Sequence, residues 1–454
     1  MLAFIKRFAP EAPRFIGEVA ARVPYEIRLG YGADYRNALK TIRQFEDSSS
    51  DFKRAFIFER IKTLVELAFY TVPFYRRFYV ERGFSPEQLC SFDDIGKIPV
   101  VTKDLLQTVP LEERSAPRRG RVATFTGGST GEPFKFYSDP RQIGNEWAHI
   151  HVIWKKLGYC QKSLLLSVAL EPEKPRVFYD ALRHSIVLNV HYPRNELIEA
   201  FLALPFKRRQ VRFFRGYPSA WAEILAYGET SAPDFLIQLR RTLRGSLLAS
   251  EYPFPHFREV VERTTQCPTI SWYGLSERCV LAYEKTEDYL YEPMQSYGYC
   301  EALETSDGRV SLVGTAYWNS ASPFIRYQID DIIEPVEIRD GLLRSFRISE
   351  GRSGDYLVDK NGQKFSITHL NLSCRESTWE IVRCVQVEQT QPGKVTFWIT
   401  PRREISIEQA KKAFDFDRLN LDCAFRFVDA PFLSRRGKTP LRITDENVVR
   451  GSGK

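Results

Sequence analysis

Short apolar runs alternate with helical patterns between residues 135 and 330, and this alternation restricts the fold more than any other feature of the sequence. Runs of this length suit buried strands, and the longer segments between them have the periodicity of helices. Strands that alternate with helices are typical of an α/β sheet. The patterns predict strands at residues 163–170, 185–190 and 211–214, and helices at residues 142–157, 195–204, 219–227 and 256–265.

Composition places the chain among ordinary globular proteins. Its 454 residues suffice for two or more domains, with 43% hydrophobic and 27% charged residues. No run of 18 apolar residues occurs, so we expect no membrane-spanning helix. Eight cysteines are scattered without a C-x-x-C pair, which indicates reduced thiols and a cytoplasmic protein. The net charge of +8 agrees with binding of phosphate-rich small molecules, and no nucleic-acid-binding signature is present.

The N-terminal region is expected to be helical. Residues 52–82 have helical periodicity, which Pro73 ends or interrupts, and Ser85-Pro86 is a typical start for a further helix. Residues 1–30 mix basic and apolar side chains, and charge interrupts them too early for a signal peptide. Contact with a membrane surface and packing on the chain's own domain both stay open. Packing is favoured, because the basic residues do not share one face.

A loop rich in glycine and hydroxyl residues follows the first third of the domain. Consecutive backbone N–H groups and hydroxyls in such a loop form a concavity that suits a polyphosphate, and glycine allows a ligand to approach closely. A solvated hairpin turn is the alternative. The spacing is not that of a Walker A loop. The candidate phosphate-binding residues are Thr126, Gly127, Gly128, Ser129, Thr130 and Gly131.

Two further motifs follow predicted strands. Residues 216–219, Gly-Tyr-Pro-Ser, stand between a strand and a helix, where α/β folds bind ligands, although Pro218 could simply start the helix. Residues 273–277 read Tyr-Gly-Leu-Ser-Glu after an apolar strand. Tyr273 offers an aromatic face for a base, and Glu277 offers a carboxylate for Mg²⁺. A strand end followed by a helix cap is the alternative for this motif.

The last part of the chain begins with a pair of aspartates. Asp331 ends a strand-like alternation, and residues 351–355, Gly-Arg-Ser-Gly-Asp, have the composition of a hinge. The remaining residues predict a small α+β unit with strands at 395–400 and 425–428 and a helix at 407–414. A basic loop at residues 435–440 contains Lys438.

Taken in order, these motifs resemble the adenylate-forming superfamily of acyl-CoA synthetases, luciferases and peptide-synthetase adenylation domains. The resemblance extends over nearly the whole chain and is strongest to phenylacetate–CoA ligase and its capsule-biosynthesis relatives. It implies ATP-dependent activation of a small-molecule carboxylic acid as an acyl-adenylate, with Mg²⁺, followed by transfer to the thiol of CoA. Transfer to a carrier thiol, an amine or a sugar in polysaccharide or natural-product tailoring is one alternative, and a non-catalytic nucleotide-binding relative is another.

The resemblance also implies roles for individual residues. The loop from Thr126 to Gly131 would wrap the β- and γ-phosphates. Glu251 would border the adenine, and Tyr273 with Gly274 would stack on it. Asp331 would bind the ribose with help from Arg352, and Ser276 would contact the α-phosphate. Glu277 would hold Mg²⁺, and Lys438 would be the catalytic cation.

The implied architecture is a large α/β N-terminal domain of mixed sheets and helices, residues 1–350, with a helical region at residues 1–95. A mobile α+β lid, residues 351–454, would carry Lys438. The sequence departs from the family pattern at Gly354, where the hinge usually has an acidic residue or lysine. Some relatives have a Cys/His cluster after the Tyr-Gly-x-Ser-Glu motif. Cys279 and Cys300 have no histidine between them, so we expect no zinc.

Overall fold

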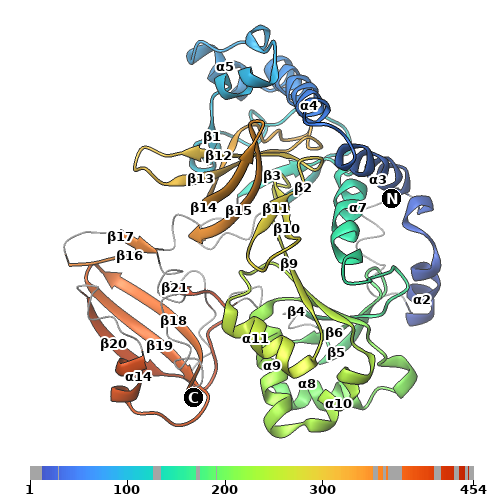
Figure 1. The fold of residues 1–454 in the computed structure, drawn as a ribbon, viewed down its shortest axis with the longest axis vertical. Coiled ribbons are helices and arrows are strands. Elements are labelled where there is room, and N and C mark those ends of the chain that lie inside the picture. The colour runs from blue at the N-terminus through green and yellow to red at the C-terminus, as the bar shows by residue number, and fades with distance from the viewer. Residues whose placement is uncertain are drawn as a thin grey trace.

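The computed structural model has a large mixed sheet with helices on its faces and a smaller C-terminal sheet beside it (Figure 1). This mixed α/β architecture confirms the fold class predicted from the alternating sequence pattern. The structure describes residues 13–28, 30–125, 134–169, 174–190, 192–350, 356–360, 364–366, 381–413, 421–433, 439–444 and 448.

Within these residues, thirteen strands form the large sheet, in the order β12-β13-β14-β15-β11-β10-β9-β8-β7-β4-β6-β5 with β1 beside β14. Strands β9, β8, β7, β4 and β6 are parallel neighbours, and the rest of the sheet is mainly antiparallel. The bounds are β1 Val101–Thr102, β4 Leu165–Ala169, β5 Val177–Asp180, β6 Ser185–Asn189, β7 Phe213–Gly216, β8 Gly245–Leu248, β9 Thr269–Gly274, β10 Leu281–Glu284, β11 Tyr291–Pro293, β12 Tyr299–Glu304, β13 Val310–Thr315, β14 Tyr327–Arg339 and β15 Leu342–Glu350.

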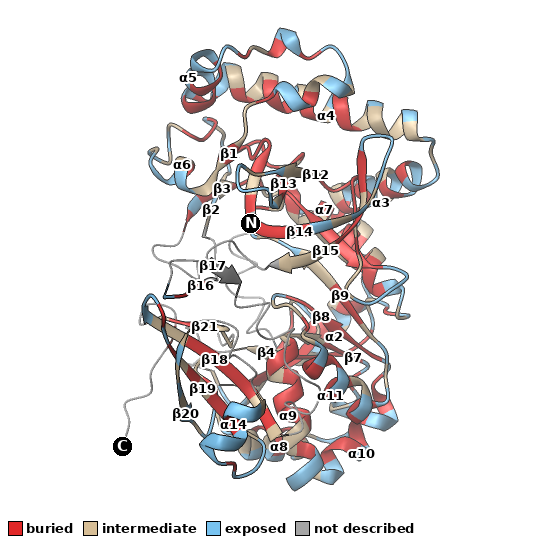
Figure 2. Cartoon of the chain, turned by 60° about the vertical axis from the view of Figure 1, so that its left-hand side comes forward, coloured by how far each residue is buried: buried red, intermediate tan, exposed pale blue. Residues whose placement is uncertain are grey.

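Helices cover both faces of the parallel strands. Phe214 of β7 packs with the helices α8 to α11, whereas Phe213 belongs to the cluster formed with α3 and α7. This division follows from the alternation of side chains along a strand. The exposed faces of α10 and α14 lie at the surface in Figure 2. The bounds are α2 Arg14–Arg22, η2 Tyr25–Ile27, α3 Gly32–Glu46, α7 Gln142–Lys155, α8 Arg194–Leu202, η5 Phe206–Arg208, α9 Pro218–Ser231, α10 Pro233–Thr242 and α11 Pro255–Thr265.

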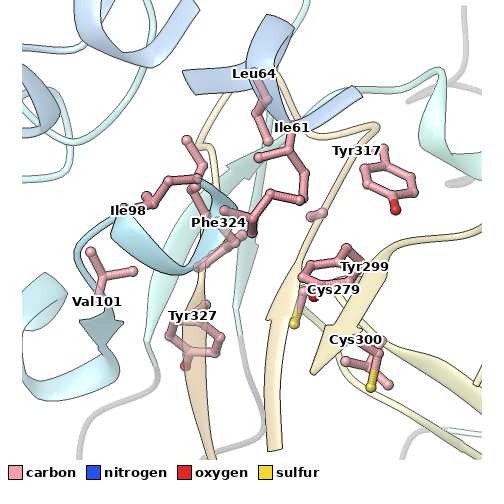
Figure 3. Packing of buried hydrophobic residues seen from close by; sticks show 14 of the residues in the cluster. Ile61, Leu64, Ile98, Val101, Cys279, Tyr299, Cys300, Tyr317, Phe324 and Tyr327 are labelled. Carbon is pink, nitrogen blue, oxygen red and sulfur yellow. The ribbon is translucent and has the colours of Figure 1, made fainter. Parts of the chain in front are cut away.

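A second group of helices packs on the β12–β15 end of the sheet. One core joins these helices to the strands, with Ile61 and Leu64 from α4 above Phe324 and Tyr327 (Figure 3). Pro73 interrupts the predicted long helix as expected, but residues 86–88 form only a single 3₁₀ turn. The bounds are α4 Ser50–Thr71, α5 Pro73–Glu81, η3 Pro86–Gln88, η4 Phe92–Lys97, α6 Lys103–Gln107 and the hairpin strands β2 Val122–Phe125 and β3 Lys135–Ser138.

The C-terminal part has its own sheet and core. Its four strands have the order β20-β19-β18-β21. Phe397 and Ile399 of β19 are buried in an apolar cluster that is separate from the cores of the large sheet. Figures 1 and 2 both place this sheet next to α9, and the ion pair between Arg383 of β18 and Glu223 of α9 joins them at 2.8 Å. The bounds are β16 Tyr356–Val358, β17 Lys364–Ser366, β18 Val382–Gln391, β19 Lys394–Pro401, α14 Ile407–Ala413, β20 Asp422–Phe427 and β21 Arg442–Ile443.

The N-terminal segment forms the short helix α2. Gly17 of this helix lies against Tyr179 of β5, so α2 packs on its own sheet, while Phe15 and Val19 stay exposed. Membrane contact by this segment stays untested. In the part of the chain that the structure describes, no helix has the length and apolar character needed to cross a membrane.

Candidate active site

Three of the sequence motifs follow neighbouring parallel strands. Gly216 of β7 is in register with Leu248 of β8, which is in register with Ser271 of β9. The carboxyl ends of the three strands therefore lie at one edge of the sheet, and this edge is where α/β sheets bind ligands. The segments that leave this edge carry Ser219, Glu251 and Tyr273 to Glu277.

Glu251 connects the Gly-Tyr-Pro-Ser motif with the C-terminal part of the chain. Its Oε2 accepts hydrogen bonds from the backbone N–H of Ser219 at 3.3 Å and from the Ser219 hydroxyl at 2.7 Å. Its Oε1 accepts a bond from the backbone N–H of Thr439 at 3.3 Å. Thr439 is the residue after Lys438, so the sequence neighbour of the predicted catalytic lysine lies at the predicted adenine border.

Tyr273 and Asp331 form a second connection, between β9 and β14. The Tyr273 hydroxyl donates to Oδ2 of Asp331, which is 7% exposed. Burial, followed by the adjacent Asp331 carboxylate, raises the pKa of Tyr273 well above 10. The phenol therefore stays protonated and remains a donor to Asp331 at physiological pH.

Glu277 is held by the start of β14. The Tyr327 hydroxyl donates to Oε1 of Glu277 at 3.1 Å, and both residues are buried. Glu277 lies in a turn between β9 and β10, so the alternative of a helix cap at this motif is wrong. In the same turn Ser276 is exposed, and Gly274, which ends β9, is exposed too.

The strands that flank the glycine-rich loop are linked to Glu277 through a series of aromatic contacts that ends at Tyr327. Strands β2 and β3 form a hairpin in which Phe125 is paired with Lys135. The ring centroids of Phe136 of β3 and Phe324 lie 5.2 Å apart, and those of Phe324 and Tyr327 lie 5.1 Å apart. The loop from Thr126 to Gly131 begins and ends at this hairpin and itself lies outside the described residues, as do Arg352 and Lys438.

Residues around β14 support this strand and do not belong to the site. Arg326 precedes β14 and donates to the backbone oxygens of Gly96 and Ile98 at 2.8 and 2.7 Å, and it pairs with Glu301 at 2.7 Å. A side chain at Gly298 would meet the Cys279 carbonyl oxygen at 2.3 Å, so this position requires glycine. These contacts fix the strand that presents Asp331 and Tyr327.

The structure thus places Glu251 and Glu277 after the carboxyl ends of β8 and β9 and bonds Tyr273 of β9 to Asp331 within β14. The roles assigned to these residues stay predictions. Tyr327, Ser219 and Thr439 were given no role from the sequence. Ser219 lies within the motif at residues 216–219 and Thr439 follows Lys438, whereas Tyr327 lies four residues before Asp331. A tyrosine four residues before Asp331 was the available signal for Tyr327. The contact of Thr439 with Glu251 joins residues 188 positions apart in the chain.

Solved structures with this architecture show the fold family. A 2-hydroxyisobutyryl-CoA ligase, solved in the postadenylation state with an acyl-AMP, superimposes with a TM-score of 0.64 at 16% identity and covers 87% of this chain and 90% of the ligase. The chain has the fold of the adenylate-forming ligases. An acyl acid amido synthetase, AtGH3.15, shares this adenylate-forming fold with a TM-score of 0.59 at 11% identity, covering 92% and 96% of the two chains.

Phenylacetate-coenzyme A ligases and Protein CapK are similar to this chain in sequence. The phenylacetate-coenzyme A ligase of Aromatoleum evansii is 24% identical over 74% of this chain and 78% of the ligase. Protein CapK of Staphylococcus aureus is 23% identical over 62% of this chain, and the match spans 63% of CapK, less than two-thirds of its length. No family model matches the sequence. The resemblance inferred from the ordered motifs is confirmed.

Proposed function

We propose that the protein activates a carboxylic acid with ATP as an acyl-adenylate and then transfers the acyl group to the thiol of CoA. The placement of Glu251 and Glu277 after the carboxyl ends of β8 and β9, with Tyr273 of β9 bonded to Asp331 of β14, carries this proposal. The sequence similarity to phenylacetate-coenzyme A ligases supports it and points to an acid and a thiol as substrates.

In the first half-reaction, an oxygen of the substrate carboxylate attacks the α-phosphorus of ATP, and the bond to pyrophosphate breaks. Asp331, held by the Tyr273 hydroxyl, would accept hydrogen bonds from the ribose hydroxyls. Ser276 and the loop from Thr126 to Gly131 would donate to the phosphates. Positioning and stabilisation of the developing charge account for most of the catalysis in such transfers.

The residues present fit a magnesium ion that arrives with ATP. Glu277 is a buried carboxylate held by the Tyr327 hydroxyl, and Mg²⁺ is usually bound by one or two carboxylates together with substrate phosphates. The bound ion would neutralise phosphate charge. Lys438 would supply a compact cation to the α-phosphate, and the contact of its neighbour Thr439 with Glu251 supports this role.

In the second half-reaction, the CoA sulfur attacks the acyl carbon and AMP leaves. We assign residues 1–350 to the domain that binds ATP and the acid, and residues 351–454 to a lid that delivers Lys438 and then rotates for the thiol. The separate sheet and apolar cluster of the C-terminal part support this division.

The test is acid-dependent exchange of pyrophosphate into ATP with aryl, fatty, amino and sugar acids. Exchange with at least one acid, followed by detection of the acyl-CoA by mass spectrometry, is the expected result. If the protein binds ATP but no acid supports exchange, it is a non-catalytic nucleotide-binding protein. This outcome would contradict the proposed function.

A second candidate differs only in the acceptor. The similarity to CapK favours transfer to a carrier thiol, an amine or a sugar within polysaccharide assembly. Adenylate formation without any acyl-CoA product, and release of AMP when an amine or sugar acceptor is added, would favour this candidate.

A further inference from the structure

A cationic side chain lies one residue before the Gly-Tyr-Pro-Ser motif. Arg215 occupies β7 in register with Ser167 of β4 and Leu247 of β8. Since Phe214 faces α9, Arg215 faces the opposite side of the sheet, which α7 covers. Its guanidinium carbon lies 5.8 Å from the ring centroids of both Trp147 and Trp154 of α7.

Arg215 has no salt-bridge partner among the described residues. It forms no hydrogen bond or ion pair with any residue that the structure describes, and Asp180, the nearby carboxylate, is paired with Arg183 at 2.5 Å. Burial, assisted by Arg183, lowers the pKa of Arg215 to about 10, so the group remains a cation at neutral pH. The residue nevertheless keeps some exposed surface. An uncompensated charge in a desolvated position is costly unless a partner binds it.

Two neighbouring polar atoms are also without partners. Trp154 and His151 are each 1% exposed, and the indole Nε1 and the imidazole Nε2 have no hydrogen-bond partner. The two rings lie 5.6 Å apart. Burial lowers the pKa of His151 to about 3, so this residue is neutral. Unsatisfied buried polar atoms are rare in native proteins and indicate a missing ligand or water. Arg215 and Trp154 can only donate, so the missing group is an acceptor.

This cluster adjoins the proposed active site. Trp272 lies 5.7 Å from Trp154 and directly precedes Tyr273, and Ser219, four residues after Arg215, donates to Glu251. Arg215 therefore lies near the carboxyl end of β7, and the unpartnered atoms of Trp154 and His151 belong to α7, which covers the sheet face away from α9. A molecule whose carboxylate reacts at this edge could extend its other end toward Arg215.

We infer that the activated acid carries a second anionic group, and that Arg215 binds this group beside the indoles of Trp147 and Trp154. The inference rests on the proposed function. The substrate class is a dicarboxylic acid, or an acid with a sulfonate or phosphonate at its far end, because the guanidinium binds such planar or multivalent oxyanions in a bidentate manner. Arg215 therefore determines which acid is bound and takes no part in the attack on the α-phosphorus.

The experiment compares acids that differ only at the far end. Benzoate and hexanoate are measured against terephthalate, 4-sulfobenzoate, 4-phosphonobenzoate and adipate in the pyrophosphate exchange assay, with wild type, Arg215→Met, Arg215→Lys and Arg212→Met. Arg212 is exposed and three residues earlier in the chain, so it is the matched control. Each acid is also titrated against tryptophan fluorescence, which reports binding beside Trp147 and Trp154 without any reaction.

For wild type we expect kcat/KM for the best dianionic acid to exceed that of its monoanionic counterpart by at least about tenfold. Arg215→Met should reduce this ratio by roughly 10- to 100-fold, which at about 1.4 kcal/mol per decade is about 1.4–2.8 kcal/mol. Arg215→Lys should keep part of the ratio, and Arg212→Met should keep all of it. The three para substituents distinguish carboxylate, sulfonate and phosphonate recognition.

A ratio that is unchanged in Arg215→Met, or a wild type that prefers the monoanionic acids, would overturn the inference while the exchange itself upholds the proposed function. If no acid supports exchange, the proposed function fails, and the fluorescence titration decides the inference alone. Tighter binding of dianions that depends on Arg215 would support it, and equal binding of both acid types would contradict it.

Discussion

Replacing Tyr273 with phenylalanine separates two roles of this residue. The family resemblance assigns the ring to stacking on adenine, whereas the structure shows the hydroxyl bonded to Asp331. Tyr273→Phe keeps the ring and removes only the donor. If the hydroxyl orients Asp331 for the ribose, the variant should bind ATP more weakly although the stacking surface is intact.

The magnitude follows from the charge and burial of the pair. A hydrogen bond to a charged group contributes about 1.5–3 kcal/mol, and Asp331 is 7% exposed, so solvent screens the interaction little. The dissociation constant for ATP should therefore rise by up to roughly 10- to 150-fold. Because the pKa of Tyr273 lies well above 10, the difference from wild type should be constant between about pH 6 and pH 9.

The assay is calorimetric titration with ATP and MgCl₂ at several pH values. Tyr291→Phe is the matched control, because the Tyr291 hydroxyl is buried and lies 3.0 Å from the neutral Ser271 hydroxyl on the same strand as Tyr273. This control should leave ATP affinity within about threefold of wild type, since a neutral hydrogen bond contributes only about 0.5–1.5 kcal/mol to stability. Equal ATP affinity in Tyr273→Phe and wild type would refute the orienting role, and an equal loss in both variants would show a general effect of lost packing.

Four further outcomes are expected. Lys438→Ala should reduce adenylate formation by orders of magnitude while preformed adenylate still reacts with the acceptor, and near-normal exchange would remove the catalytic assignment. Glu277→Ala should raise the Mg²⁺ concentration needed for half-maximal exchange, and an unchanged metal dependence would place the ion elsewhere. Limited proteolysis should cut within residues 349–355, and ATP with the acid should suppress the cut; cleavage at the same rate with and without ligands would contradict a closing lid. Arg383→Ala removes one of two cations paired with buried Glu223 and should speed that cleavage, whereas an unchanged rate would show that the ion pair does not hold the C-terminal sheet.

The helices and strands of the parallel region were largely predictable, because their apolar periodicity is strong. Helix α7 begins at the predicted residue, and β6 differs from its predicted range by one residue. Strand β8 was missed, since Gly245-Ser-Leu-Leu248 is only four residues long and begins with residues typical of turns. Its burial is imposed by the neighbours β7 and β9, which a single sequence does not show.

The site was predictable as a set of motifs but not as a set of contacts. The order of the motifs led to Glu251, Glu277 and Asp331, which the large sheet places after β8, after β9 and within β14. The hydrogen bond from Thr439 to Glu251 depends on where the C-terminal sheet packs, and the sequence carries no local signal for it. Arg215 was missed because the predicted strand at residues 211–214 ended two residues before the end of β7 at Gly216. A charged residue at the end of the apolar run was the available signal.

The bond between Thr439 and Glu251 has a thermodynamic consequence. The same carboxylate accepts a hydrogen bond from the Ser219 hydroxyl of α9 and another from a backbone N–H of the C-terminal segment. Occupancy of this edge of the sheet and the position of the C-terminal segment are therefore coupled. A ligand that binds more tightly when Thr439 contacts Glu251 must favour that contact by the same factor, because coupling free energies are reciprocal. The affinity of this edge for nucleotide can thus be changed by substitutions far from it, in the strands that hold Thr439 in place.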